Sequence, residues 1–146
     1  MSNLSEAERI AYNVSGEVPP PVEVRLVCTT RTQSSVGLRR VRDVMALIAS
    51  RRMSEWPDDS WWQSQLPAWF IRSFEGHSIE DILQDSNLWD FGSWIDAMQE
   101  TGWEWWSSSH CAFVWTISIC VHSDPCSIGP LEYLCRAAGA DAVLIK

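Results

Sequence analysis

The clearest pattern of hydrophobic and polar positions lies in residues 112–122, "AFVWTISICVH". Large apolar side chains occupy alternate positions, which is typical of a strand with one buried face. We expect the odd-numbered residues, from Phe113 to Val121, to face the core. Residues 103–107 predict a partner strand, joined to it by a short connection at "SSH" (108–110). Residues 22–28 and 142–145 predict two further strands.

Apolar residues recur at helical spacing in two longer segments. Residues 36–52 place an apolar stripe on one face, and five arginines fall largely on the other side, where we expect them to face water. Residues 90–101 predict the clearest helix, and Gly102 is placed to stop it. The apolar stripe of the first helix holds Val41, Val44, Met45 and Ile48; that of the second holds Phe91, Trp94, Ile95 and Met98. The arginines are Arg39, Arg40, Arg42, Arg51 and Arg52.

Start and stop signals mark several short helices. Ser5 and Glu8 have capping-box spacing in residues 3–13, and Ser78 and Asp81 repeat it at the start of "SIEDIL". Prolines divide residues 55–74 into short helical pieces, and Pro130 suits the first turn of a helix that runs to Ala138.

The order of these elements is α, β, α, several short α, then β-β-α-β. This order predicts the α+β class, with a small, largely antiparallel β-sheet covered by several helices. A length of 146 residues, without internal repeats or a linker, predicts a single domain over residues 1–146. No apolar run approaches the roughly 18 residues of a membrane span. The polar, acidic N-terminus lacks the pattern of a secretory signal, so we expect a cytoplasmic protein.

Charge divides the chain more sharply than its net value of −8 suggests. Residues 1–54 hold eight arginines against five acids, whereas residues 55–135 hold thirteen acids and a single base, Arg72. Residues 73–135 contain neither lysine nor arginine. A strongly acidic surface repels nucleic acid and anionic membranes and attracts basic proteins. We therefore expect a protein partner, and neither nucleic acid nor a membrane.

Five cysteines are scattered without a Cys-x-x-Cys pair, which favours reduced and mostly buried thiols. Cys120, His122 and Cys126 are the one grouping that resembles metal ligands, but zinc normally takes four ligands with paired spacings. We expect no metal and no cofactor, while the possibility of metal binding at these three residues stays open.

No motif for a nucleophile, a phosphate loop, a dinucleotide or a metalloprotease occurs in the chain. Pairs such as Cys111 with His77, or Cys120 with His122, have nothing in the sequence that favours them. Thirteen acids offer too many carboxylate pairs to single one out. We expect the protein not to be an enzyme.

Ten tryptophans are a stronger indication of function, because tryptophan is enriched at binding hot spots. Strand parity places Trp103 and Trp105 on one face and Trp106 on the opposite face, with Glu104. Trp106 is therefore the best candidate for an exposed, functional tryptophan, and either Trp61 or Trp62 is the next, because adjacent helical residues cannot both point inward. A sugar-binding platform is a weaker alternative, since such modules are generally secreted and all-β.

Residues 86–106, "SNLWDFGSWIDAMQETGWEWW", and 130–140, "PLEYLCRAAGA", are similar to stretches in the immunity proteins that bacteria make against polymorphic toxins, including contact-dependent and secretion-system effectors. The resemblance is general in character, and no diagnostic motif fixes one family. It implies a stoichiometric inhibitor whose cognate toxin is often a nuclease or another enzyme with a basic groove.

Under this hypothesis acidic residues steer association and aromatic residues anchor the complex. The predicted toxin-binding residues are Asp96, Glu100, Glu104 and Trp106, with Asp81 and Asp85 as a second patch. An adaptor domain of a bacterial complex is the alternative, and a small enzyme with an unrecognised site is the third. The identity of the toxin, the face that binds it and the oligomeric state stay open.

Overall fold

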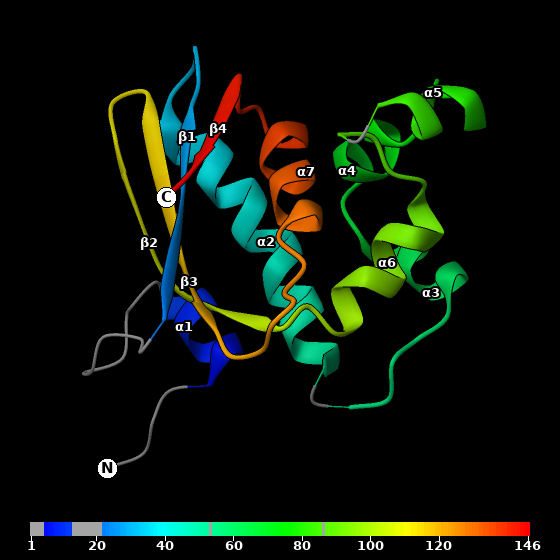
Figure 1. The fold of residues 1–146 in the computed structure, drawn as a ribbon, viewed down its shortest axis with the longest axis horizontal. Coiled ribbons are helices and arrows are strands. Elements are labelled where there is room, and N and C mark those ends of the chain that lie inside the picture. The colour runs from blue at the N-terminus through cyan, green and yellow to red at the C-terminus, as the bar shows by residue number, and fades with distance from the viewer. Residues whose placement is uncertain (1–4, 13–21, 53, 86) are drawn as a thin grey trace.

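A computed structural model describes residues 5–12, 22–52, 54–85 and 87–146. The outer ends of the predicted 3–13 helix lie outside these ranges. The elements occur in the predicted order (Figure 1). In chain order they are α1 (Glu6–Tyr12), β1 (Glu23–Thr29), α2 (Ser34–Arg52), α3 (Asp59–Gln65), α4 (Ala68–Ser73), α5 (Ile79–Gln84), α6 (Phe91–Gln99), β2 (Trp103–Cys111), β3 (Val114–Val121), α7 (Gly129–Ala137) and β4 (Ala142–Ile145).

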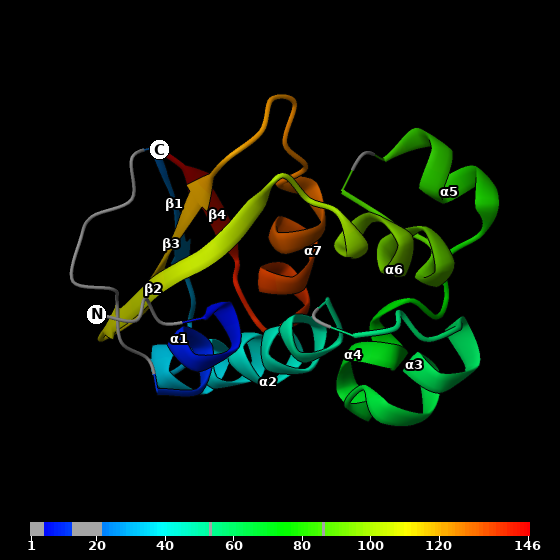
Figure 2. The same ribbon diagram turned by 90° about the horizontal axis from the view of Figure 1, so that it is seen from below.

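The four strands form one sheet in the order β2-β3-β1-β4, and every neighbouring pair is antiparallel. Helices α2 and α7 pack on one face of this sheet, and α1 lies against α2 and the edge strand β2 (Figures 1 and 2). Helices α3 to α6 form a separate cluster beyond α2 and α7. The predicted α+β class is confirmed. None of the described helices is long and apolar enough to cross a membrane.

The core lies between the sheet and the helices. Trp115, Ile117 and Ile119 of β3 are fully buried, which confirms the predicted inward face. The stripes of α2 and α6 are buried as well, except that Phe91 is half-buried. The two ends of the predicted inward face differ, because Phe113 lies in a turn and is 59% exposed, and Val121 is half-buried.

The connection between β2 and β3 differs from the prediction. The "SSH" residues lie within β2 and pair with β3, and the chain turns at Ala112 and Phe113 instead. Strand pairing uses backbone groups, and a partly wet sheet accepts serine, so these polar side chains do not end the strand. The Ala112 and Phe113 carbonyls accept hydrogen bonds from the N–H groups of Ser34 and Thr30, which ties the turn to the start of α2.

Local capping fixes the helix starts as expected. Both capping boxes are formed, at Ser5 with Glu8 and at Ser78 with Asp81. The predicted stop at Gly102 is displaced, because α6 already ends at Gln99 with Glu100 as its C-cap. Gly102 instead has a φ of 77° in the turn into β2, where a Cβ would lie 2.6 Å from the Ser123 Oγ atom.

The prediction that the arginines of α2 face water is wrong for Arg42 and Arg52. The Arg42 guanidinium donates to the Ile10 carbonyl from Nε at 3.0 Å and from Nη2 at 2.8 Å, which fastens α1 to α2. Long arginine side chains can cross an apolar surface and deliver their charge to a distant backbone group. Arg52 likewise donates to a backbone carbonyl, that of Met98 in α6, and it also pairs with Glu6 at the start of α1.

Candidate functional site

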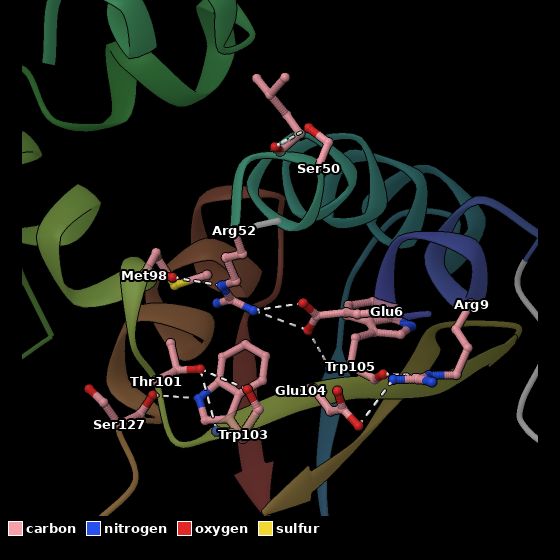
Figure 3. A network of polar contacts seen from close by, with 11 residues as sticks. Glu6, Arg9, Ser50, Arg52, Met98, Thr101, Trp103, Glu104, Trp105 and Ser127 are labelled. Carbon is pink, nitrogen blue, oxygen red and sulfur yellow. Dashed lines mark hydrogen bonds and ion pairs between the residues drawn. The ribbon is translucent and has the colours of Figure 1, made fainter. Parts of the chain in front are cut away.

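The end of α2 and the start of β2 are joined by a network of polar contacts (Figure 3). The Arg52 Nη1 group donates to both carboxylate oxygens of Glu6, at 2.8 and 3.1 Å, and Arg52 Nε donates to the Met98 carbonyl at 2.9 Å. The second oxygen of Glu6 also accepts the Trp105 N–H at 2.7 Å. This largely buried pair therefore connects α1, α2, α6 and β2.

Glu104 and Trp106, two of the predicted partner-binding residues, both contact Arg9 of α1. The Arg9 Nη2 atom lies 3.3 Å from a Glu104 carboxylate oxygen, and its guanidinium lies 4.6 Å from the centre of the Trp106 ring. Arg9 Nε donates to the Trp105 carbonyl at 2.9 Å. The charge of Glu104 is thus offset within the chain, and Trp106 is half-buried beneath an arginine.

Arginines cover two other half-buried tryptophans in the same way. Arg51 lies 4.3 Å from the centre of the Trp61 ring, and Arg40 lies 5.4 Å from that of Trp69. Of the adjacent pair named by the sequence, Trp62 is fully buried and Trp61 is half-buried. Five tryptophans are fully buried, namely Trp62, Trp94, Trp103, Trp105 and Trp115.

Glu100 and Glu104 line one cleft of about 590 Å³, between the start of α1, the ends of α2 and α6, and the start of β2. Glu6, Arg52 and His122 also line it, whereas Asp96 and Trp106 do not. The structure thus brings together two of the four predicted residues of the first patch. Glu6 is paired with Arg52 and Glu104 with Arg9, so Glu100 is the carboxylate of this cleft that has no ion-pair partner among the described residues, and its charge favours a positively charged group.

The helical cluster carries the main acidic surface, which we call the acidic lobe and define as residues 55–100. Its ten carboxylates are all exposed. None of them forms an ion pair among the described residues, whereas the five ion pairs that do form use acids outside the lobe. The lobe's acids are Glu55, Asp58, Asp59, Glu75, Glu80, Asp81, Asp85, Asp90, Asp96 and Glu100.

Four acids of the lobe also hold its backbone in place, namely the predicted Asp81 and Asp85 and, in addition, Asp58 and Asp90, and Asp58 caps α3. Asp81 closes the capping box of α5, and the Asp85 Oδ1 atom accepts the Asn87 N–H at 2.9 Å. Asp90 caps α6, and hydrogen bonds from Ser93 lower the pKa of its carboxyl below the ordinary value. These carboxylates stay exposed while they accept the bonds. Asp81 lies in the first turn of α5 and Asp85 is its C-cap, and α5 is at the far side of the lobe from the sheet (Figure 1).

The cysteines form no cluster with metal-binding geometry among the described residues. Cys120 is buried on the sheet, while His122 is exposed beyond the end of β3. Cys28 of β1 lies against Cys135 of α7, and this contact together with burial raises the pKa of the Cys135 thiol well above its ordinary value. Cys135 therefore stays protonated at neutral pH and packs as an apolar side chain.

The chain matches no protein-family model, no curated protein and no solved structure.

The position of Arg9 is the feature of this site that the sequence did not indicate. Its contacts join the first helix to the strand that holds Glu104 and Trp106, and no local pattern signals a pair so far apart in the chain. The accumulation of acids from residue 55 onward was the signal for the lobe, and it was visible in the sequence as the lack of bases.

Proposed function

We propose that this protein is a non-catalytic, cytoplasmic immunity protein that binds and neutralises a basic toxin. The observation that carries the proposal is the acidic lobe, with ten exposed carboxylates and no internal ion pair among the described residues. A surface of one sign accelerates the encounter with a partner of the opposite sign by about 10- to 1,000-fold. The cleft beside Glu100 adds a negatively charged hollow that suits a lysine or arginine side chain.

The ion pairs of the structure decide which acids can be substituted to test this proposal without disturbing the fold. Reversing Glu104 would leave Arg9 beside a positive charge and would disturb the contact between α1 and β2. The carboxylates of Glu80, Asp96 and Glu100 have no hydrogen-bond or ion-pair partner among the described residues, so their reversal breaks no specific contact. Asp43, an exposed acid of α2 outside the lobe, provides a matched control.

The experiment uses the product of the gene that lies beside this chain's gene, purified in an inactivated form. We expect Glu80→Lys, Asp96→Lys and Glu100→Lys together to slow association at least tenfold at low salt, and the difference to shrink at high salt. Asp43→Lys alone is expected to have less effect than Asp96→Lys alone. Association is followed by stopped-flow fluorescence, and protection is scored in cells that express the active toxin.

Three results would contradict the proposal at different levels. Unchanged association of the triple variant with a toxin that the wild type neutralises would exclude the lobe as the binding surface. Binding of the wild type without neutralisation would favour an adaptor domain instead. If the wild type neither binds nor neutralises the neighbouring gene product, that product is excluded as the target.

A further inference from the structure

Helix α5 carries an apolar pair that the fold does not use. Ile79 is 77% exposed and Leu83 is 81% exposed, which makes them the two most exposed large apolar side chains in the described part of the chain. They are four residues apart and therefore share one face of the helix. No residue of α5 is buried. Their exposure thus has no explanation in the packing of this molecule.

The helix is nonetheless well formed. The Ser78 N–H donates to the Asp81 carboxylate and the Asp81 N–H donates to the Ser78 hydroxyl, each at 3.1 Å. At the other end, the Asp85 N–H donates to the Asp81 carbonyl at 3.0 Å. These bonds hold α5 helical before any partner arrives, which lowers the entropy cost of binding through it. Figures 1 and 2 both place α5 at the extremity of the molecule opposite the sheet.

The charges around the apolar pair define what can cover it. Glu75 and Glu80 are exposed near Ile79 in the sequence, and their carboxylates have no hydrogen-bond or ion-pair partner among the described residues. Asp81 and Asp85 add two more exposed carboxylates. The nearest lysine or arginine along the chain is Arg72, and no other follows before Arg136. A second copy of this chain would bring the same negative charges together, which opposes association through α5.

We propose that α5 is a docking helix that inserts Ile79 and Leu83 into an apolar pocket of a basic protein, with lysines and arginines of that protein around the rim. The inference rests on the proposed function, because it assigns the anchor of the same complex. Burial of two branched side chains supplies the affinity, and the carboxylates supply orientation and rate.

The test compares three variants, by isothermal titration for affinity and by stopped-flow kinetics for rates, with the inactivated product of the neighbouring gene. Ile79→Ala with Leu83→Ala removes the apolar pair and keeps α5 helical, because alanine is the best helix former. Val36→Ala removes an exposed apolar side chain from α2 and serves as the control. Glu75→Gln with Glu80→Gln removes charge only. Thermal unfolding of each is expected to match the wild type.

We expect the apolar double variant to bind about 30-fold or more weakly, mainly through faster dissociation. Val36→Ala is expected to bind like the wild type, and Glu75→Gln with Glu80→Gln to bind more slowly. Binding of the apolar double variant within twofold of the wild type would overturn the proposal, even if the toxin is neutralised and the immunity function stands.

A second arm does not depend on the toxin. A displayed library of a small three-helix domain, randomised on its surface, is selected on the wild-type protein. Binders that carry net positive charge and fail to bind the apolar double variant would support the docking helix, even if no toxin were neutralised. Binders that bind the wild type and the apolar double variant equally well would overturn it. Sedimentation equilibrium tests the second copy. If the wild type is a dimer and the apolar double variant is a monomer, a second copy of this chain covers the apolar pair, and the proposal is overturned.

Discussion

Gly37 of α2 lies directly against the Trp115 ring of β3. A Cβ atom at this position would lie 2.4 Å from the Cζ3 atom of Trp115 and 2.6 Å from its Cη2 atom. The Trp115 ring is fully buried and has no space into which it can move. Because Gly37 has no side chain, α2 can pack directly against Trp115 of β3.

We predict that Gly37→Ala destabilises the protein by about 1–3 kcal/mol, because overpacking outweighs the roughly 1 kcal/mol that alanine gains in helix propensity. Gly92→Ala in α6 is the control, since its Cβ would meet the movable Asp59 carboxylate at 3.0 Å and the Asp90 Oδ2 atom at 3.7 Å, which is an ordinary contact distance. The control is expected to be neutral or slightly stabilising in urea unfolding. A Gly37→Ala protein as stable as the control would contradict this account of the contact.

Trp106 illustrates how far the sequence predicts a single residue. Alternation along the strand correctly separates buried Trp103 and Trp105 from half-buried Trp106. The same pattern contains no information about Arg9, whose guanidinium covers the ring from another element. Contacts of this kind depend on how α1 docks on the sheet edge, and the candidate site was therefore only partly predictable at the residue scale.

At the scale of elements, the structure follows local chemistry closely. Capping boxes, prolines and apolar periodicity are local signals, and the helices start where Ser5, Ser78 and Pro130 predict. The β2–β3 hairpin was misplaced because serine is a turn former as well as a tolerated strand residue. A register shift between Trp105 and Ser107 further breaks strict alternation, and no sequence pattern marked it.

The cap at Asp90 gives a prediction for α6. The Asp90 Oδ2 atom accepts the Ser93 N–H at 3.1 Å, so we expect Asp90→Ala to lower stability by about 1 kcal/mol at pH 7. Because the folded pKa of Asp90 is depressed, this contribution is complete above the unfolded pKa of about 3.9 and is lost as pH falls through the lower folded pKa.

The measurement is urea unfolding of both proteins at several pH values between neutrality and about pH 3. The difference between wild type and Asp90→Ala should narrow toward the acidic end. Asp96→Ala, which removes an exposed acid from the same helix without removing a cap, should not lower stability. A constant difference at every pH would mean that the carboxylate charge does not matter to the cap.

For the whole molecule, the distribution of ion pairs separates two kinds of acidic residue. Acids outside the lobe, such as Glu6, Glu23 and Glu104, are paired with arginines and contribute to the fold. Acids inside the lobe repel one another, and this repulsion destabilises the compact state. Stability alone does not favour such an arrangement, which is why we assign it to binding.

Asp96 and Glu100 are the clearest case, because two features of α6 oppose them. They are four residues apart, where like charges repel by about 0.2–0.5 kcal/mol, and they lie near the helix C-terminus, where negative charge is unfavourable.

We predict that Asp96→Asn with Glu100→Gln stabilises the folded protein by about 1 kcal/mol at about 10 mM salt, and by less at about 1 M salt, where the Debye length falls to about 3 Å. Glu6→Gln, which breaks a largely buried pair, should instead cost about 3 kcal/mol at both salt concentrations.

Chemical unfolding of the wild type, the double variant and Glu6→Gln measures these differences in stability, and stopped-flow association of the same proteins with the inactivated toxin measures binding. A more stable protein that associates more slowly would show that these two acids are retained for the partner, whereas unchanged stability at low salt would remove the argument that the acidic lobe opposes folding.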